Sequence, residues 1–150
     1  MKNKYAVKNV KTWVGREGGA YQASLYRNDK KVGTVTDDAR GGEIKYCCCN
    51  DKETQLLELE SKKIKNSGTY INLNVQMFVA CLVDEFEEIK WIRKQCKKNI
   101  VFTLKSNKDK YCTIPLKKYS YTNPAHVKFI REQLEKHHGL NLKKIYNEKI

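Results

Sequence analysis

The hydrophobic period of the chain changes near residue 50, and this change sets the class of fold. Over residues 5–49 apolar and polar side chains alternate, as at Tyr21, Ala23 and Leu25, and clusters rich in Gly, Asn and Asp interrupt the alternation. A period of two between turn residues predicts antiparallel strands. We therefore expect an antiparallel β-meander of four strands, over residues 5–14, 21–26, 31–36 and 43–49.

After residue 50 the apolar side chains recur at steps of three and four, which indicates helices. Asn50 and Glu53 have the spacing of a capping box, and Asn66-Ser67-Gly68 is expected to end the helix that they open. The helix carries three leucines: Leu56, Leu57 and Leu59. We expect this helix to cover the sheet.

The longest predicted helix begins after Asn72 or Asn74, since either residue can serve as its N-cap. Its apolar side chains follow one face: Val75, Phe78, Leu82, Phe86, Ile89 and Cys96. Acidic residues gather over 84–88 and basic residues over 90–98, in the order that the helix dipole favours. We expect the meander to pack on this long central helix.

A C-terminal β-hairpin and two helices are predicted after the long helix. Residues 100–104 and 111–114 alternate apolar and polar side chains around a turn at 106–109. Asn123 as N-cap, Pro124 at the first helical position and Gly139 beyond the last turn bracket the first of the two helices.

The second of these helices is predicted to start at Asn141, with Leu142 and Ile145 facing inward. The predicted fold class is α+β, because a run of strands is followed mainly by helices. We expect one compact domain over residues 1–150, with a sheet-rich, neutral half at 1–72 and a helical, cationic half at 73–150.

The charge of the chain is unevenly distributed. The net charge is +13; residues 1–88 hold fourteen basic and thirteen acidic side chains, whereas residues 89–150 hold sixteen basic and four acidic ones. A field of this sign attracts phosphate backbones and acidic protein surfaces. The predicted binding residues are lysines, tyrosines and one arginine: Lys94, Lys97, Lys98, Lys105, Lys108, Lys110, Lys117, Lys118, Tyr119, Tyr121, Lys128 and Arg131.

The basic residues of this half are almost all lysines, and its two arginines are Arg93 and Arg131. Lysine contacts phosphates as a point charge, whereas paired guanidinium contacts are the usual means of reading guanine. The composition therefore favours contact with a nucleic-acid backbone or an acidic surface over base-specific recognition.

One pattern suggests catalysis. Asp38, Glu43 and Lys45 follow the acid, acid-x-lysine order of restriction-type nucleases, in which two carboxylates hold a divalent metal and the lysine assists the attacking water. The two acids lie closer together in the sequence than that motif usually places them. The run from Asp37 to Gly42 is also typical of a hairpin turn, which is the simpler interpretation.

The remaining motifs predict no cofactor and no metal. The six cysteines include no C-x-x-C pair, so we expect reduced thiols: Cys47, Cys48, Cys49, Cys81, Cys96 and Cys112. No apolar run has the length of a signal peptide or of a membrane span. We expect a cytoplasmic protein that does not enter membranes and is a monomer or a small homo-oligomer.

Several segments resemble a family of small accessory proteins of phages and plasmids. The similarity lies in Gly15-Arg16-Glu17-Gly18, Leu25-Tyr26-Arg27, Lys31 to Val35, Asp37-Asp38, Gly41-Gly42, Met77 to Ala80, Leu82 to Glu87, Val101 to Lys105 and Tyr121 to Gly139. The resemblance implies a bacterial host and a role in host takeover or anti-defence, including anti-CRISPR inhibition. It supplies no functional residues, and the Cys47-Cys48-Cys49 run departs from the strand of that family.

Two hypotheses from different classes follow. In the first, the protein is not an enzyme and uses its C-terminal lysines to dock on nucleic acid, or on a defence nucleoprotein such as a CRISPR effector, which it blocks by occupation. A general RNA- or DNA-binding protein is a variant of that hypothesis. In the second, the protein is a small metal-dependent nuclease.

Overall fold

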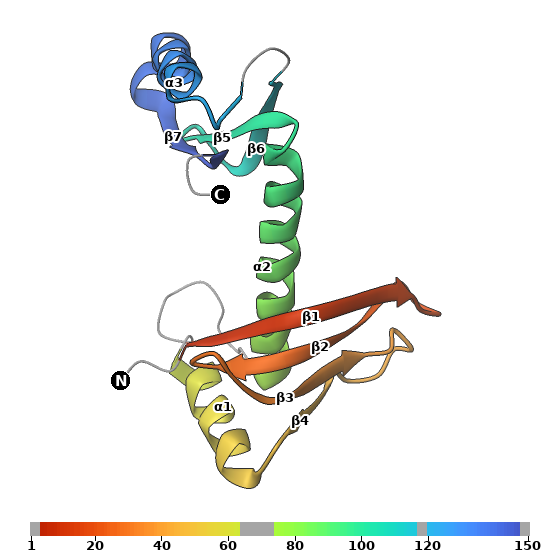
Figure 1. Ribbon diagram of the computed structural model, residues 1–150. Coiled ribbons are helices and arrows are strands. Elements are labelled where there is room, and N and C mark those ends of the chain that lie inside the picture. Colours follow the sequence, from red (N-terminus) through yellow and green to blue (C-terminus); the bar gives the residue numbers. More distant parts are fainter. Residues whose placement is uncertain (1–3, 64–73, 117–119, 148–150) are drawn as a thin grey trace. The chain divides into compact units, whose positions relative to one another are not determined.

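The computed structural model describes residues 4–63, 74–116 and 120–147, except for the side chains of Lys108 and Asp109 (Figure 1). Within these ranges it contains seven strands in two antiparallel sheets and three α-helices, which confirms the α+β class. The chain divides into two compact units, residues 1–87 and residues 88–150. We describe them separately as the N-terminal and the C-terminal unit, and a single domain stays a prediction.

Four strands form the sheet of the N-terminal unit in the order β1-β2-β3-β4, so the predicted antiparallel meander is confirmed. The strands are β1 (Tyr5–Val14), β2 (Gly19–Arg27), β3 (Lys30–Asp37) and β4 (Lys45–Cys48). Gly33 of β3 lies so close to β4 that a Cβ atom there would overlap the carbonyl oxygen of Cys47. Only glycine fits at this position without moving β4.

Strand β1, at one edge of this sheet, contains a backbone irregularity. Its pairing with β2 shifts between Lys8 and Lys11, and Asn9 has a φ of 56°. Asparagine tolerates this left-handed conformation better than most residues. The result is a bulge near the middle of a ten-residue outer strand.

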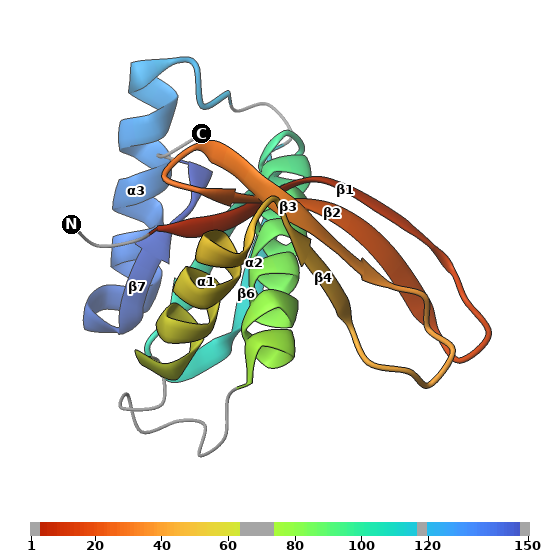
Figure 2. The same cartoon turned by 90° about the horizontal axis from the view of Figure 1, so that it is seen from below.

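Helices α1 (Asp51–Lys63) and α2 (Val75–Cys96) supply the other half of the core of this unit. Leu57 of α1 is fully buried and belongs to the same apolar cluster as Leu25 and Val35 of the sheet and Phe78 and Val79 of α2. Figure 2 shows α1 beside the first turns of α2. In the described part of the chain no helix is long and apolar enough to cross a bilayer.

Two predicted N-caps are confirmed. The side-chain oxygen of Asn50 accepts from the backbone N–H of Glu53 at 2.9 Å, and that of Asn74 accepts from Met77 at 2.9 Å. These bonds satisfy amide groups that have no partner within the helix. Asn72 and the predicted stop at 66–68 lie outside the described residues.

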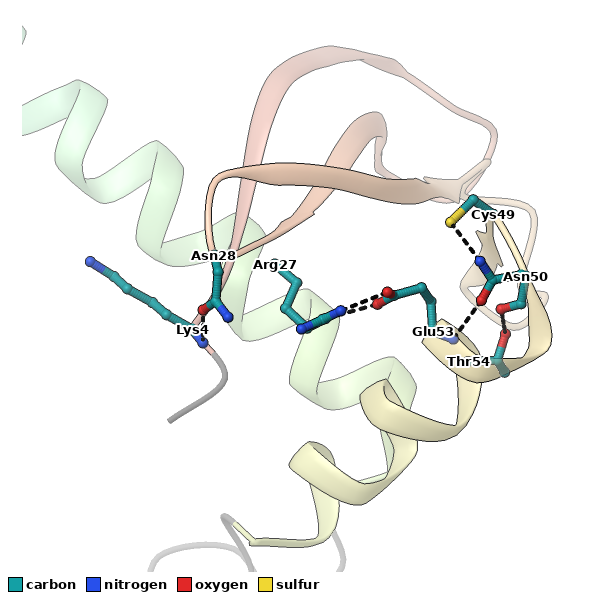
Figure 3. A network of polar contacts seen from close by, with 7 residues as sticks. All are labelled: Lys4, Arg27, Asn28, Cys49, Asn50, Glu53 and Thr54. Carbon is teal, nitrogen blue, oxygen red and sulfur yellow. Dashed lines mark hydrogen bonds and ion pairs between the residues drawn. The ribbon is translucent and has the colours of Figure 1, made fainter. Parts of the chain in front are cut away.

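The carboxylate of Glu53 does not complete the capping box, because it binds Arg27 at the end of β2 (Figure 3). Arg27 donates from Nε to Oε2 at 2.8 Å and from Nη2 to Oε1 at 2.6 Å. Both side chains are largely shielded from water. This two-bond contact holds the first turn of α1 against the sheet.

Glu53→Gln is expected to lower the melting temperature of the N-terminal unit by a few degrees at neutral pH. The hydrogen bonds from Arg27 lower the pKa of Glu53 in the folded protein. The ion pair therefore stabilises the fold fully above the unfolded-state pKa of about 4.5, and the contribution is lost as pH falls through the lower folded-state pKa. Thermal unfolding followed by circular dichroism at pH 7 and at steps below 4.5 measures both effects.

Glu58→Gln, on the same helix, is the matched control for that experiment, and it should change the melting temperature little. A Glu53→Gln protein that melts like the wild type at pH 7 would contradict the stabilising role of the pair.

The C-terminal unit contains a three-stranded sheet in the order β6-β5-β7. Its elements are β5 (Asn99–Leu104), β6 (Asn107–Pro115), α3 (Pro124–His138), a 3-10 turn (Gly139–Asn141) and β7 (Leu142–Ile145). Ile130 and Leu134 of α3 pack on Ile100 and Phe102 of β5, which places the helix on one face of the sheet. The other face holds a smaller apolar cluster of Ile92, Cys96 and Val101.

The signals that bracket α3 are confirmed, but the predicted last helix is wrong. Asn123 accepts from the Ala125 N–H at 3.0 Å, and Gly139 ends the helix with a φ of 51°. Residues from Leu142 to Ile145 form a strand that pairs with β5. Because the pairing contains a bulge, Leu142 and Ile145 both pack in the apolar cluster on the α3 side of the sheet. Their separation of three residues imitates the spacing of a helix.

Two further details differ from the sequence predictions. The hairpin turn lies at Lys105 and Ser106, since Leu104 already pairs with Asn107. Asn141 fixes this turn, because its backbone carbonyl accepts from the Lys105 N–H and its side-chain oxygen from the Ser106 N–H. Leu59, one of the three leucines of α1, and Ile89, from the predicted apolar face of α2, have 55% and 41% of their surface exposed.

The side chain of Asn147 joins the ends of three segments in the C-terminal unit. Its oxygen accepts from the Val101 N–H at 2.7 Å, and its nitrogen donates to the carbonyls of Cys96 at 3.1 Å and Asn99 at 2.8 Å. Asn147 is buried. It therefore satisfies one carbonyl at the end of α2 and two backbone groups of β5, and its bonds to Cys96 and Val101 are buried.

Candidate anion-binding surface

The excess of basic residues that the sequence shows over 89–150 falls within the C-terminal unit. Residues 88–150 hold sixteen basic and five acidic side chains. Seven of the predicted binding residues are exposed there: Lys94, Lys97, Lys98, Lys105, Lys110, Lys128 and Arg131. Lys117, Lys118 and Tyr119 lie outside the described residues, as does the side chain of Lys108.

Five of the predicted residues line two adjoining grooves, which we name together the basic groove. The first groove, of about 500 Å³, is lined by Lys97, Lys98 and Tyr121, and the second, of about 450 Å³, by Tyr121, Lys128 and Arg131. Tyr121 and the neighbouring Thr122 belong to both. The structure thus brings the end of α2 and the first turns of α3 to the same half-buried tyrosine.

The loop before α3 shapes the point where the two grooves meet. Ser120 donates its backbone N–H to Nδ1 of His126 at 3.1 Å, and its hydroxyl oxygen accepts from the Thr122 N–H at 3.2 Å. The Ala125 N–H is bound to the cap Asn123. Since these backbone donors already have partners, attraction of an anion depends on the side chains of the groove.

The charge of Lys128 remains largely available to a partner. Lys128 lies 4.0 Å from Glu132 one turn along α3, but 80% and 58% of these side chains are exposed. An ion pair in such contact with water is weak. Lys94, Lys105 and Lys110 line neither of the two grooves and add to the general field of the unit.

An aromatic cluster of this unit was missed by the sequence predictions. The Tyr111 ring lies 5.4 Å from that of Trp91 and 5.2 Å from that of Tyr146, and the Lys144 ammonium stands 4.1 Å from the Tyr146 ring centre. Tyr111 donates its hydroxyl to Glu88 at 2.5 Å. Burial, followed by that hydrogen bond, raises the pKa of Tyr111 well above its usual range, so the hydroxyl stays protonated as a donor.

The residues of the nuclease hypothesis lie in and beside the turn between β3 and β4. Asp37 and Asp38 accept backbone N–H groups two residues ahead, at 2.8 and 3.3 Å, as is usual for turn residues. Lys45 lies 3.9 Å from Asp38, and Glu43 is exposed. Within the described ranges no three His, Cys, Asp or Glu side chains are grouped as metal ligands.

All six cysteines are free thiols. Burial raises the pKa of Cys48 and Cys96. Since the thiolate is the reactive form, these two thiols are poor nucleophiles at neutral pH. Cys47, Cys49 and Cys81 are exposed.

Comparison with known proteins adds no relative: no family model, curated protein or solved structure matches the chain. The resemblance to phage and plasmid accessory proteins therefore stays a prediction. The basic groove is the feature of the described residues on which a functional proposal rests best.

Proposed function

We propose that the protein is a non-catalytic binding protein whose C-terminal unit docks on an anionic partner through the basic groove and blocks that partner by occupation. The partner is nucleic acid or the acidic surface of a nucleoprotein. The convergence of Lys97, Lys98, Lys128 and Arg131 around Tyr121 carries this proposal.

The distribution of charge supports a docking role. Sixteen basic side chains against five acidic ones exceed what the C-terminal unit needs for solubility, whereas the N-terminal unit is nearly neutral. Concentrated charge raises the rate of encounter with anions. Lysine supplies most of it, which fits contacts with phosphates or carboxylates better than the reading of bases.

We further propose that the setting is a mobile genetic element and that the partner belongs to a bacterial defence system, for example a CRISPR effector. This part of the proposal rests on the resemblance to phage and plasmid accessory proteins. Blocking by occupation requires no active site, because a bound protein that covers a nucleic-acid channel prevents the substrate from entering.

Reversing three charges of the basic groove tests the proposal. The triple variant Lys97→Glu, Lys98→Glu and Lys128→Glu is expected to bind fluorescein-labelled single-stranded DNA, duplex DNA and acidic peptides at least tenfold more weakly than the wild type. Fluorescence anisotropy titrations at several salt concentrations measure the affinities. For a nucleic-acid partner contacted at six or more phosphates, the wild-type affinity should also fall by about 10³ between 50 and 200 mM salt.

The matched control reverses three exposed lysines of the N-terminal unit: Lys11→Glu, Lys31→Glu and Lys52→Glu. Both triple variants have the same net charge, so a difference between them reports the location of the charge. Equal affinities of the groove variant and the wild type for every anionic probe would refute the proposal.

A further inference from the structure

The C-terminal unit contains an apolar groove that the proposed function does not use. It lies between the β5–β6 hairpin and α3 and encloses about 500 Å³. Ile130 and Leu134, buried in the core of the unit, form part of its floor. Ile114 and Phe129 line it with 41% of their surface exposed.

This groove has the properties of a site for an apolar group. Its volume falls within the range of about 300–1,000 Å³ that is common for binding pockets. Its polar side chains are Gln133, His137 and His138, all on α3. Bulky apolar side chains left partly exposed beside one another gain free energy when a partner removes them from water.

The surroundings of the apolar groove favour an acidic occupant. Lys136 is exposed and follows Phe129 by seven residues, which places it two turns further on the same side of α3. The C-terminal unit as a whole, with sixteen basic and five acidic side chains, adds a positive field around the groove. Although Glu132 and Glu135 are also exposed on α3, the unit is strongly positive as a whole, so carboxylates flanking an apolar anchor would be attracted to it. The apolar lining offers a phosphate backbone little to bind.

We propose that the apolar groove takes a bulky apolar side chain, such as Leu or Phe, from an acidic segment of a partner protein. The inference rests on the proposed function, because the basic charges supply the attraction that brings the segment to the groove. If this inference is right, the partner is an acidic protein surface and not bare nucleic acid. The anchor gives the interface the buried apolar centre that stable protein–protein contacts have.

Two fluorescein-labelled peptides of Asp and Glu test this inference. They are identical except that one carries a Leu and a Phe near its centre where the other carries two Ala, so their net charges are equal. The wild-type protein is expected to bind the Leu/Phe peptide on the order of tenfold more tightly, since the buried side chains contribute that much beyond charge attraction. Anisotropy titrations with the full chain measure both affinities.

Phe129→Ala and Ile114→Thr are each expected to reduce the tenfold preference while leaving the affinity for the Ala peptide unchanged. Leu140→Ala, which removes a side chain that is 91% exposed and does not line the groove, should preserve it. The emission of Trp91 in a Trp13→Phe background checks that the C-terminal unit of each variant is folded. Phe129 lies on α3 and Ile114 on β6, so if one substitution unfolds the unit, the other still tests the groove.

The outcomes separate this inference from the proposed function. Equal affinities of the wild type for the two peptides, both lost in the triple lysine variant, overturn the apolar site and leave the proposed function standing. Binding of DNA strands without binding of either peptide shows that the partner is nucleic acid and also overturns the site. Failure to bind any anionic probe refutes both.

Discussion

Asn147→Ala is expected to destabilise the C-terminal unit by about 3 kcal/mol, because it removes three hydrogen bonds from a buried position. The backbone N–H of Val101 loses its acceptor where Val101 is fully buried, and the carbonyls of Cys96 and Asn99 lose a donor. Water cannot reach the Val101 N–H or the Cys96 carbonyl without opening the unit. Asn147→Asp should be at least as damaging at neutral pH, since a carboxylate cannot donate to the two carbonyls.

The two tryptophans allow this loss to be assigned to one unit. Trp13 lies in the N-terminal unit and Trp91 in the C-terminal unit, where it contacts Tyr111. In a Trp13→Phe background, urea unfolding followed by Trp91 emission gives the free energy of unfolding of the C-terminal unit. Asn141→Ala serves as control, because its bonds to Ser106 are exposed and water can replace them. Equal unfolding midpoints of Asn147→Ala and the Trp13→Phe parent would show that the three hydrogen bonds of Asn147 do not stabilise the C-terminal unit.

Leu57→Ala is expected to cost the N-terminal unit about 2–5 kcal/mol. Leu57 of α1 is fully buried against the sheet and the first turns of α2. Shortening its side chain leaves a cavity that the closely packed core fills only in part. Urea unfolding monitored by circular dichroism measures the difference from the wild type.

Leu59→Ala is the control on the same helix, since 55% of the Leu59 surface is exposed, and it should change the free energy of unfolding by less than about 0.5 kcal/mol. If the two substitutions had equal effects, the assignment of Leu57 as the inward-facing leucine would be wrong. The sequence could not make that choice, because Leu56, Leu57 and Leu59 all fit a helix face of ordinary width.

Features governed by neighbouring residues were predictable. The four-strand meander follows from alternation and turn residues, and Asn50, Asn74 and Asn123 occupy N-cap positions because capping depends on groups two or three residues away. Features governed by distant residues were not. Residues from Leu142 to Ile145 form a strand because they pair with the free edge of β5. The hairpin turn lies at Lys105 and Ser106, where Asn141, 35 residues further along the chain, binds it.

In the candidate site, too, some features could be predicted from the sequence and others depend on distant residues. Charge counting identified the cationic stretch of the sequence and its lysines, but it could not show that the end of α2 and the start of α3 meet at Tyr121. Nothing in the sequence distinguished Phe129 and Ile114 from core residues, because their partial exposure depends on how α3 lies against the hairpin. Asn147 carried no signal either, since its partners lie 46 to 51 residues away.

The bulge in β1 has a consequence for the behaviour of the protein at high concentration. Strands β1 and β4 are the outer strands of the N-terminal sheet, and outer strands carry unpaired backbone groups that can recruit a strand from another molecule. Strand β4 has only four residues, so the ten-residue β1 is the more exposed to this risk. The bulge at Asn9 interrupts the straight edge of β1, and the exposed Lys11 places a positive charge there that would repel a second copy. We therefore expect the bulge to disfavour aggregation through the edge of this sheet.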